Sequence, residues 1–356
     1  MNGESTRKGK IGRVYTYNGL NRVETDEAGM GDIIAFVGID DINIGETVAD
    51  AENPEALPTI SIDEPTLSMM FSVNNSPFAG REGDYVTSRH LRDRLFKEVE
   101  TNVSMRVEET DSPDSFKVSG RGELHLAVLI ETMRREGYEL QVGKPRVIFK
   151  EINGQKCEPL EHLTIDVPQE FMGAVMENLG VRKAELINMV ELAGYLRMEF
   201  VVPARGLIGF RAQFLTATKG NGIMNHVFHG YAPYKGDIPG RTRGALVAFE
   251  DGETTPYGLN SVQDRGTLFL GANVPVYTGQ IIGENAREND MDVNPNKKKH
   301  VTNMRSSSSD EAVRLTPPRI FSLEQALEWI NDDELVEVTP ENIRMRKAIL
   351  DRSARA

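Results

Sequence analysis

Residues 118–124 read VSGRGEL and residues 202–208 read VPARGLI, so one strand-to-helix junction occurs twice, 84 positions apart. In each copy an alternating apolar run leads into an Arg-Gly pair, and a helical pattern follows. In the first copy the apolar stripe is Leu126, Leu129, Ile130 and Met133, with Gly137 as the stop signal. A duplication of this length is stronger evidence about the fold than a single motif, because each copy is one supersecondary unit.

The segment around the first junction predicts a complete element order. Strands are expected at 67–73, 103–108, 115–119 and 138–142, and helices at 88–101 and 122–136. This β-α-β-β-α-β order is that of the split ferredoxin-like unit. The second copy repeats it, with strands at 162–167 and 196–202 and helices at 169–179 and after Arg205. The sequence therefore predicts two ferredoxin-like βαββαβ domains, over residues 66–150 and 151–240.

The flanking segments have a different pattern. Residues 1–52 predict three or four strands with an Asn18-Gly19 turn, too few for a stable sheet alone, so we interpret them as one half of a larger unit. Residues 53–65 contain three prolines and are interpreted as a linker. Residues 241–356 predict a mainly β domain with one helix, opening at Ser322. The expected fold class is thus multidomain α+β.

The composition and motifs exclude several classes of function. The 356 residues include one cysteine, Cys157, so no intrachain disulfide can form. No apolar run reaches the roughly 18 residues that span a bilayer, and the N-terminus has no apolar signal segment. We therefore expect a cytoplasmic protein without membrane contact. HExxH and GxSxG motifs are absent from the sequence, and we find no catalytic constellation.

Nucleotide and metal sites are also not expected. The nearest phosphate-loop pattern, Gly3 to Lys10, is one residue too long and is followed by Ile11 instead of Ser or Thr. No NKxD sequence is present. His226 and His229 are three residues apart on an expected strand, where such side chains point to opposite faces and do not share a metal ion.

Basic residues are concentrated in two segments of a chain whose net charge is −13. Residues 203–249 hold six bases and one acid, and residues 293–309 hold four bases and no acid. These segments predict a local RNA-binding patch. The candidate RNA-binding residues are Lys297, Lys298, Lys299, His300, Asn303, Arg305, Arg205, Arg211, Lys219, Arg241 and Arg243. A solvated surface is the ordinary alternative for any one charge run, and for Arg205 it is a surface salt bridge.

The polar segment 294–309 has no hydrophobic periodicity and is predicted to be a long loop. We expect it to be mobile in the isolated chain and to become ordered on RNA. Its lysines are flexible point charges that can adapt to phosphates, whereas Asn303 and Arg305 can add directional hydrogen bonds.

Several motifs carry a family resemblance. Residues 121–126, RGELHL, resemble the domain III signature of elongation factor G-like translational GTPases, and residues 10–50 are similar to the second half of their domain II barrel. Five later segments, at 205–211, 263–266, 277–283, 302–305 and 337–340, together resemble the BipA/TypA GTPases. The resemblance covers essentially the whole chain. It implies that residues 66–150 are domain III-like, that 151–240 are domain V-like and that 241–356 are the BipA-specific domain.

The resemblance also implies a function. Members of this family bind the ribosome in a GTP-dependent manner and assist large-subunit assembly and stress responses. The implied partners are the ribosome, large-subunit rRNA and the acceptor end of A-site tRNA, which the 294–305 segment is expected to approach. The chain is expected to be a monomeric C-terminal fragment without the G domain, non-catalytic and without a cofactor, since GTP and Mg²⁺ belong to the G domain.

Two other interpretations stay open at this stage. The first is a generic RNA-binding or protein-interaction module built from ferredoxin-like repeats. The second is an enzyme whose site the sequence does not reveal.

Overall fold

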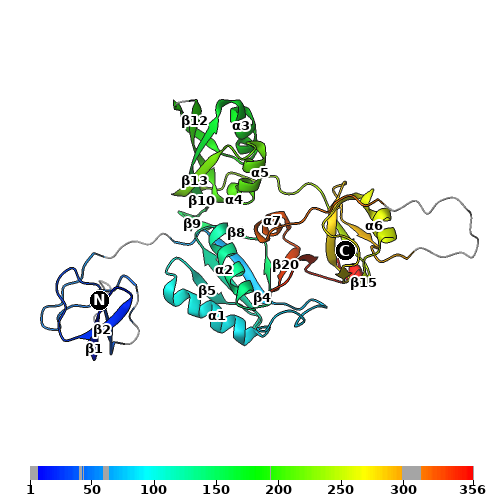
Figure 1. Ribbon diagram of the computed structural model, residues 1–356. Helices are drawn as coiled ribbons and strands as arrows, with labels where there is room; N and C mark the ends of the chain where they lie inside the picture. Colours follow the sequence, from blue (N-terminus) through cyan, green and yellow to red (C-terminus); the bar gives the residue numbers. More distant parts are fainter. Residues whose placement is uncertain are drawn as a thin grey trace, which may run out of the picture. The chain divides into compact units, whose positions relative to one another are not determined.

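The computed structural model describes residues 7–39, 42, 44–58, 64–192, 194–298 and 314–355. The chain divides into two compact units, Met1–Ile62 and Asp63–Ala356, shown with their elements in Figure 1. The structure has the mixed α+β character that the sequence predicts. None of the helices in the described part of the chain is long and apolar enough to cross a membrane.

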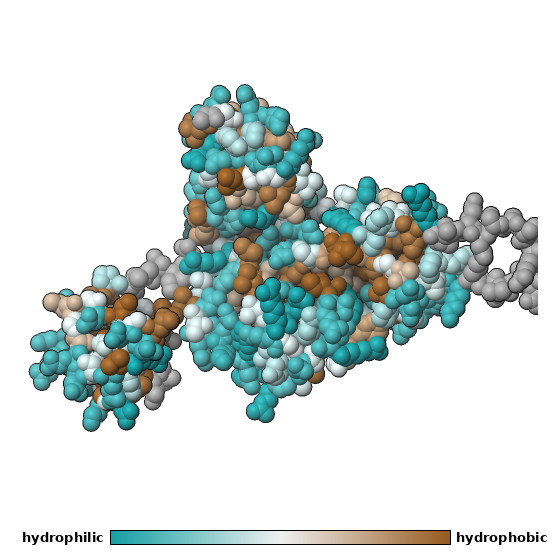
Figure 2. Space-filling view, viewed as in Figure 1, coloured by the Kyte–Doolittle hydropathy of each residue, from teal (hydrophilic) through white to brown (hydrophobic). Residues whose placement is uncertain are grey.

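The N-terminal unit contains an open three-stranded antiparallel sheet. Its strands are β1 (Arg13–Asn18), β2 (Asn21–Thr25) and β3 (Ile34–Val37), in the order β2-β1-β3. Gly19 closes the first hairpin with a φ of 63°, a conformation that glycine adopts without steric cost. Large apolar side chains such as Ile33 and Ile44 are exposed, and Figure 2 shows apolar patches on this unit. The described strands thus form no closed barrel.

The first repeat has the predicted element order. Its elements are β4 (Leu67–Val73), α1 (Ser88–Thr101), β5 (Arg106–Glu109), β6 (Ser115–Gly120), α2 (Glu123–Arg135) and β7 (Leu140–Gly143). The strands pair antiparallel in the order β5-β6-β4-β7. The predicted stripe of α2 is buried, and Gly137 ends the helix with a φ of 94°. Two short strands follow, β8 (Arg146–Val147) and β9 (Lys150–Ile152), which the sequence analysis did not predict.

The second repeat has the same strand order around its own core. Its elements are β10 (Gln155–Pro168), the one-turn helix η1 (Gln169–Phe171), α3 (Met172–Val181), β11 (Glu185–Leu192), β12 (Tyr195–Pro203), α4 (Ala204–Leu207), α5 (Phe210–Ala217) and β13 (Ile223–Pro233). The sheet order is β11-β12-β10-β13, with β9 paired to the first residues of β10. Leu163, Phe200 and Phe214 are among the buried core residues. The repeat inferred from the two Arg-Gly junctions is therefore visible as two sheets of one strand order.

The second helix of this repeat is broken, whereas the sequence predicts one continuous helix. Gly209 takes a φ of 74°, which separates α4 from α5. The carbonyls of Gly206 and Ile208, left without helical partners, accept hydrogen bonds from the Arg182 guanidinium. Glycine permits the break, and an arginine from the end of α3 satisfies the exposed backbone groups.

In its described residues, the C-terminal part contains two α-helices where the sequence predicts one. Its elements are β14 (Ala245–Ala248), β15 (Gly252–Glu253), α6 (Pro256–Gln263), β16 (Gly266–Leu268), β17 (Pro275–Val276), β18 (Gln280–Asn285), β19 (Met291–Val293), α7 (Leu323–Trp329), β20 (Glu334–Val338), β21 (Ile343–Lys347) and the one-turn helix η2 (Arg352–Ala354). The predicted capping box at Ser322 and Gln325 is confirmed. The unpredicted helix α6 begins at Thr255, whose hydroxyl accepts from the Gly258 N–H.

The sheet of the first repeat continues into the C-terminal part. Strand β20 pairs antiparallel with β7, with Val336 opposite Val142. An eleven-stranded sheet results, with the main order β19-β14-β18-β21-β20-β7-β4-β6-β5. Buried residues of both parts, such as Leu140 and Leu327, belong to one apolar core. Local periodicity gives no information about this pairing, because it joins strands that lie far apart in the chain.

Candidate nucleic-acid interface

A groove of about 1280 Å³ lies where the first repeat, the second repeat and the C-terminal part meet. Its basic lining residues are Lys144, Arg146, Arg182, Arg205, Arg241 and Arg319, and its acidic lining residues are Glu284, Glu328 and Asp332. Cations therefore outnumber acids in this lining, although the net charge of the chain is −13. Phe149, Phe321 and Trp329 add aromatic surface to the same groove.

Two predicted site residues, Arg205 and Arg241, line this groove but are held in ion pairs. Arg205 donates to both carboxylate oxygens of Glu158, at 2.5 and 3.2 Å, and the Glu158 side chain is only 1% exposed. Arg241 makes a bidentate pair with the buried Glu334, at 2.8 and 2.9 Å, and its guanidinium lies 3.8 Å from the Trp329 ring centroid. Both guanidinium groups therefore have a structural role, because each neutralises a buried carboxylate; Glu334 also pairs with the Lys347 ammonium, at 2.8 Å.

The remaining predicted bases in the described chain lie outside the groove. Arg211 and Lys219 are exposed on and just after α5, and the exposed Arg243 lies 3.5 Å from a Glu284 oxygen. Lys297 and Lys298 are exposed at the end of the segment that follows β19. Lys299, His300, Asn303 and Arg305 lie outside the described residues. The structure thus brings two of the eleven predicted residues to one surface and leaves five others elsewhere.

The first residues of the basic segment 293–309 are held by hydrogen bonds to neighbouring parts of the chain. Asn294 donates to the Glu250 carboxylate at 2.5 Å, and Asn296 donates to the Glu250 carbonyl at 3.1 Å. At the start of α6, the Thr255 N–H donates to the Pro295 carbonyl at 3.0 Å, and the Thr255 hydroxyl donates to the Lys297 carbonyl at 2.6 Å. Residues 294–297 are therefore hydrogen-bonded to Glu250 and to the start of α6, and the mobility expected of the segment stays a prediction. The Asn-Pro-Asn sequence, which favours a turn, was the available signal.

Several groove residues were missed by the sequence analysis. Lys144, Arg146, Arg182 and Arg319 come from three separate parts of the chain, and none belongs to a basic run. Lys144 makes no ion pair within the described part of the chain, whereas Arg146 pairs with the exposed Asp332 at 3.0 Å. Only the assembled fold brings these cations together.

Two carboxyl groups with raised pKa values, those of Glu123 and Glu328, lie beside Gly209, where the chain breaks between α4 and α5. Burial raises the pKa of Glu123, although its carboxylate accepts from the Gly209 N–H at 3.3 Å. Burial, together with the nearby Glu123, raises the pKa of Glu328 to about 7. Burial also lowers the pKa of Arg182, which hydrogen-bonds backbone carbonyls and the Gln213 side chain. This cluster can hold a proton near neutral pH at the junction of α2, α5 and α7.

The two histidines have separate neighbours. His226 Nδ1 lies 3.3 Å from a Glu161 oxygen, whereas the His229 ring lies 6.3 Å from the His162 ring, measured between centroids. Within the described residues no group of three or more His, Cys, Asp or Glu side chains could hold a metal ion.

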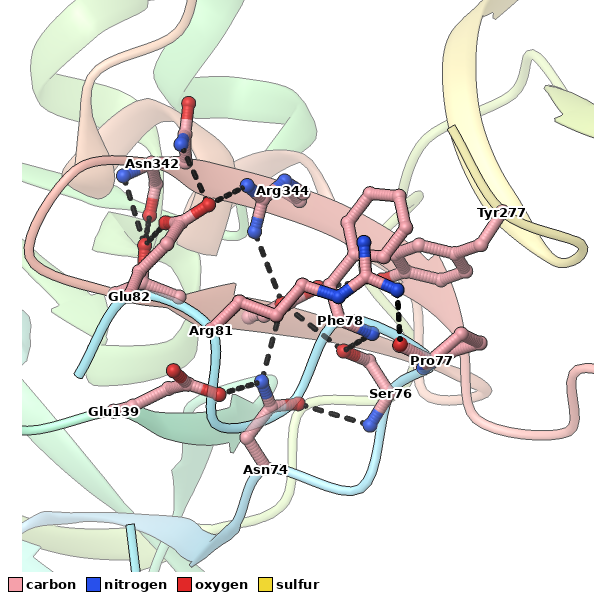
Figure 3. A network of polar contacts seen from close by, with 12 residues as sticks. Asn74, Ser76, Pro77, Phe78, Arg81, Glu82, Glu139, Tyr277, Asn342 and Arg344 are labelled. Atoms are coloured by element: carbon pink, nitrogen blue, oxygen red, sulfur yellow. Dashed lines mark hydrogen bonds and ion pairs between the residues drawn. The ribbon is translucent and has the colours of Figure 1, made fainter. Parts of the chain in front are cut away.

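A buried polar network joins the C-terminal part to the loop that follows β4, as Figure 3 shows. At its centre is Glu337, fully buried on β20, which accepts from Asn74, Ser76 and Arg344 at 3.0–3.1 Å and from the Tyr277 hydroxyl at 2.6 Å. Burial and the adjacent Glu337 carboxylate raise the pKa of Tyr277. The network fixes β20 and β21 against the first repeat.

Comparisons with known proteins agree with the motif analysis. Residues 243–352 match the family model of the TypA/BipA C-terminal domain, and residues 155–242 match that of the elongation factor G C-terminus. Proteins named large ribosomal subunit assembly factor BipA are similar to 96–98% of this chain. That of Bacillus subtilis (strain 168) is 51% identical over 348 residues, and that of Synechocystis sp. is 53% identical over 344 residues. That of Escherichia coli (strain K12) is 53% identical over 352 residues. The chain spans 57–58% of the length of these relatives.

Proposed function

Because this chain carries the C-terminal domains of the BipA/TypA family, we propose that it is the ribosome-contacting part of a large-subunit assembly factor. The observation that carries this proposal is the 51–53% identity to proteins of that name over nearly the whole chain. In this proposal the chain acts in the cytoplasm as a monomer and catalyses no reaction. GTP and Mg²⁺ would be bound by a domain outside this sequence.

The domain identities are part of the proposal. The strand orders β5-β6-β4-β7 and β11-β12-β10-β13 are equivalent, which supports two ferredoxin-like domains, over 66–150 and 151–240. Residues 1–52 would be part of the translation-factor barrel, and their exposed apolar side chains fit an incomplete core. Residues 241–356 would be the BipA-specific domain, which matches the family model over 243–352.

We propose that rRNA and the tRNA acceptor end are contacted through two cationic surfaces. One is the groove, where Lys144 and Arg146 present ammonium and guanidinium groups. The other is the basic segment 293–309. Its first residues are hydrogen-bonded to the start of α6, and Lys297 and Lys298 are exposed. Lys and Arg neutralise phosphates and release counterions, whereas the acidic remainder of the chain repels RNA elsewhere. Binding would therefore be local and salt-dependent.

The test is sedimentation of the purified chain with isolated ribosomal subunits. We expect recovery with large subunits, little with small subunits, and a strong decrease between about 50 and about 200 mM salt. Equal recovery with both subunits, or none with either, would contradict the assignment.

One observation favours the alternative of a protein-interaction module. All eight residues of the edge strand β11 are exposed, among them Leu186, Ile187 and Met189. An apolar edge strand offers unpaired backbone groups to another protein. Salt-insensitive binding to large subunits would support this alternative, because protein contacts through β11 do not release counterions from RNA.

A further inference from the structure

Aromatic rings and cations form a ladder of contacts that includes two groove-lining residues, Phe149 and Arg205. The Lys156 ammonium lies 4.0 Å from the Phe149 ring centroid and 5.1 Å from that of Tyr234. The Arg205 guanidinium lies 4.6 Å from the same Tyr234 ring. The two rings meet edge to face with centroids 5.8 Å apart. Arg205, Tyr234, Lys156 and Phe149 thus form one cation–aromatic cluster.

Hydrogen bonds and an ion pair hold Tyr234 and Arg205 in place beside Phe149 and Lys156. The Tyr234 N–H donates to the Lys156 carbonyl at 3.1 Å, beyond the paired ends of β10 and β13. The Tyr234 hydroxyl donates to Asp237 at 2.5 Å, and Arg205 is fixed by the buried Glu158. A ring presented in one orientation loses little conformational entropy when a ligand stacks on it.

Phe149 and Lys156 have the exposure that a ligand needs. The Phe149 side chain is 39% exposed and lines the groove, together with Lys144. Lys156 is also exposed, and throughout the described chain no carboxylate forms an ion pair with its ammonium or with that of Lys144. The site therefore combines a partly exposed aromatic ring, with Lys156 against one of its faces, and two cations that no acid of the described chain neutralises.

We propose that Phe149 is a stacking platform for an unpaired nucleobase of RNA, with Lys144 and Lys156 neutralising the adjacent phosphates. This proposal rests on the proposed function, and it names one surface through which the chain would contact ribosomal RNA. Base stacking on aromatic side chains tolerates any sequence, because every base has a π-face. A duplex keeps its bases stacked on one another, so the platform selects single strands, loops or bulges.

The experiment measures the affinity of the 356-residue chain for a fluorescein-labelled oligouridine of about 12 nucleotides, and for a duplex of the same length. We expect the single strand to bind more tightly than the duplex. Phe149→Leu removes the ring but keeps an apolar side chain, and it should weaken single-strand binding at least about 5-fold. The control is Phe249→Leu, since Phe249 is similarly exposed at 43% and lies outside the groove lining.

Two further variants keep the test decisive if Phe149→Leu folds poorly. Phe149→Trp keeps an aromatic face and should bind within about 2-fold of the original chain. Lys156→Gln keeps the ring and should lower the salt slope of single-strand binding by about 0.7. Equal affinity for single strand and duplex, or an unchanged affinity of a folded Phe149→Leu variant, would overturn the platform. If Phe149→Leu misfolds, an unchanged salt slope of Lys156→Gln overturns it instead.

Sedimentation with large subunits separates this proposal from the one it rests on. If the original chain sediments with large subunits while Phe149→Leu binds oligouridine normally, the platform alone fails. If oligouridine binding depends on Phe149 but the chain does not sediment with large subunits, the ribosomal assignment fails and the platform stands.

Discussion

The side-chain amide of Asn74 donates a hydrogen bond of 3.1 Å to Glu337, a residue 263 positions later in the chain. The same amide donates to Glu139 at 2.7 Å, directly before β7. Both carboxylates are buried, at 3% and 0% exposure, and they belong to the neighbouring strands β7 and β20 or their ends. One asparagine therefore links the two parts of the chain at the position where their sheets become continuous.

The first prediction concerns Glu337. Glu337→Ala should lower the free energy of unfolding by about 2–4 kcal/mol, because it removes the acceptor of the buried Tyr277 and Ser76 hydroxyls, whereas Arg344 keeps its ion pair with Glu82. Glu341→Ala changes an exposed residue in the turn of the same hairpin and should stay within about ±0.5 kcal/mol. Urea unfolding of both variants measures this, and equal effects would refute the central role of Glu337.

The second prediction concerns pH. The pKa of Glu328 is raised by burial and by Glu123 from 4.5 to about 7. Between these values the folded chain keeps a proton that the unfolded chain loses, so the contribution of Glu328 to stability falls as pH rises through this window. Glu328→Gln should therefore be more stable than the original chain at pH 8, with the difference vanishing near pH 4.

Thermal unfolding across that pH range, with the exposed Glu288→Gln as a charge-matched control, measures the effect. Arg182, Arg319 and Glu324 also face Glu328 and are unchanged in the variant. A stability difference that is the same at pH 4 and pH 8 would show that folding does not raise the pKa of Glu328.

The third prediction tests the anchor of the basic segment. A Cβ at Gly258 would lie 2.2 Å from the Pro295 carbonyl oxygen, so Gly258→Ala must displace α6 from residues 294–297. Overpacking of this kind costs about 1–3 kcal/mol, despite the higher helix propensity of alanine. Gly271→Ala is the control, because no atom lies within 4 Å of its Cβ position. Equal melting temperatures for the two variants would contradict the packing described for α6.

The fourth prediction is that the chain does not bind GTP tightly. The phosphate loop, its Ser or Thr and the base-reading NKxD sequence are absent. Isothermal titration with GTP and Mg²⁺ should give no measurable heat of binding at micromolar concentrations. Micromolar affinity would require a nucleotide site of another kind.

Some features were predictable from sequence because they depend on neighbouring residues. The Leu126–Met133 stripe, the stop at Gly137 and the capping box at Ser322 are local patterns, and the structure confirms each. The break at Gly209 was not predicted, because it depends on Arg182 of another helix. For the same reason the pairing of β20 with β7 and the convergence of Lys144 and Phe149 in the groove required the fold.

The predicted RNA-binding bases show the same difference between what neighbouring residues reveal and what only the folded chain reveals. The sequence identifies Arg205 and Arg241 as bases in an acid-poor segment, but their partners Glu158 and Glu334 lie 47 and 93 positions away. Sequence alone therefore could not separate a base that pairs internally from one that is available to a phosphate.

The most direct measurement is the salt dependence of large-subunit binding by a variant in which Lys297, Lys298 and Lys299 are all replaced by Ala. If all three lysines contact phosphates, the slope should fall by about 2–3 units, with about 0.7–0.9 for each phosphate. Unfolding should change by no more than about ±0.5 kcal/mol. A variant with Lys8, Lys10 and Lys97 replaced by Ala has the same net charge and should keep the original slope. An unchanged slope and affinity in the first variant, or an equal decrease in both, would contradict the assignment of this segment to the ribosome-binding surface.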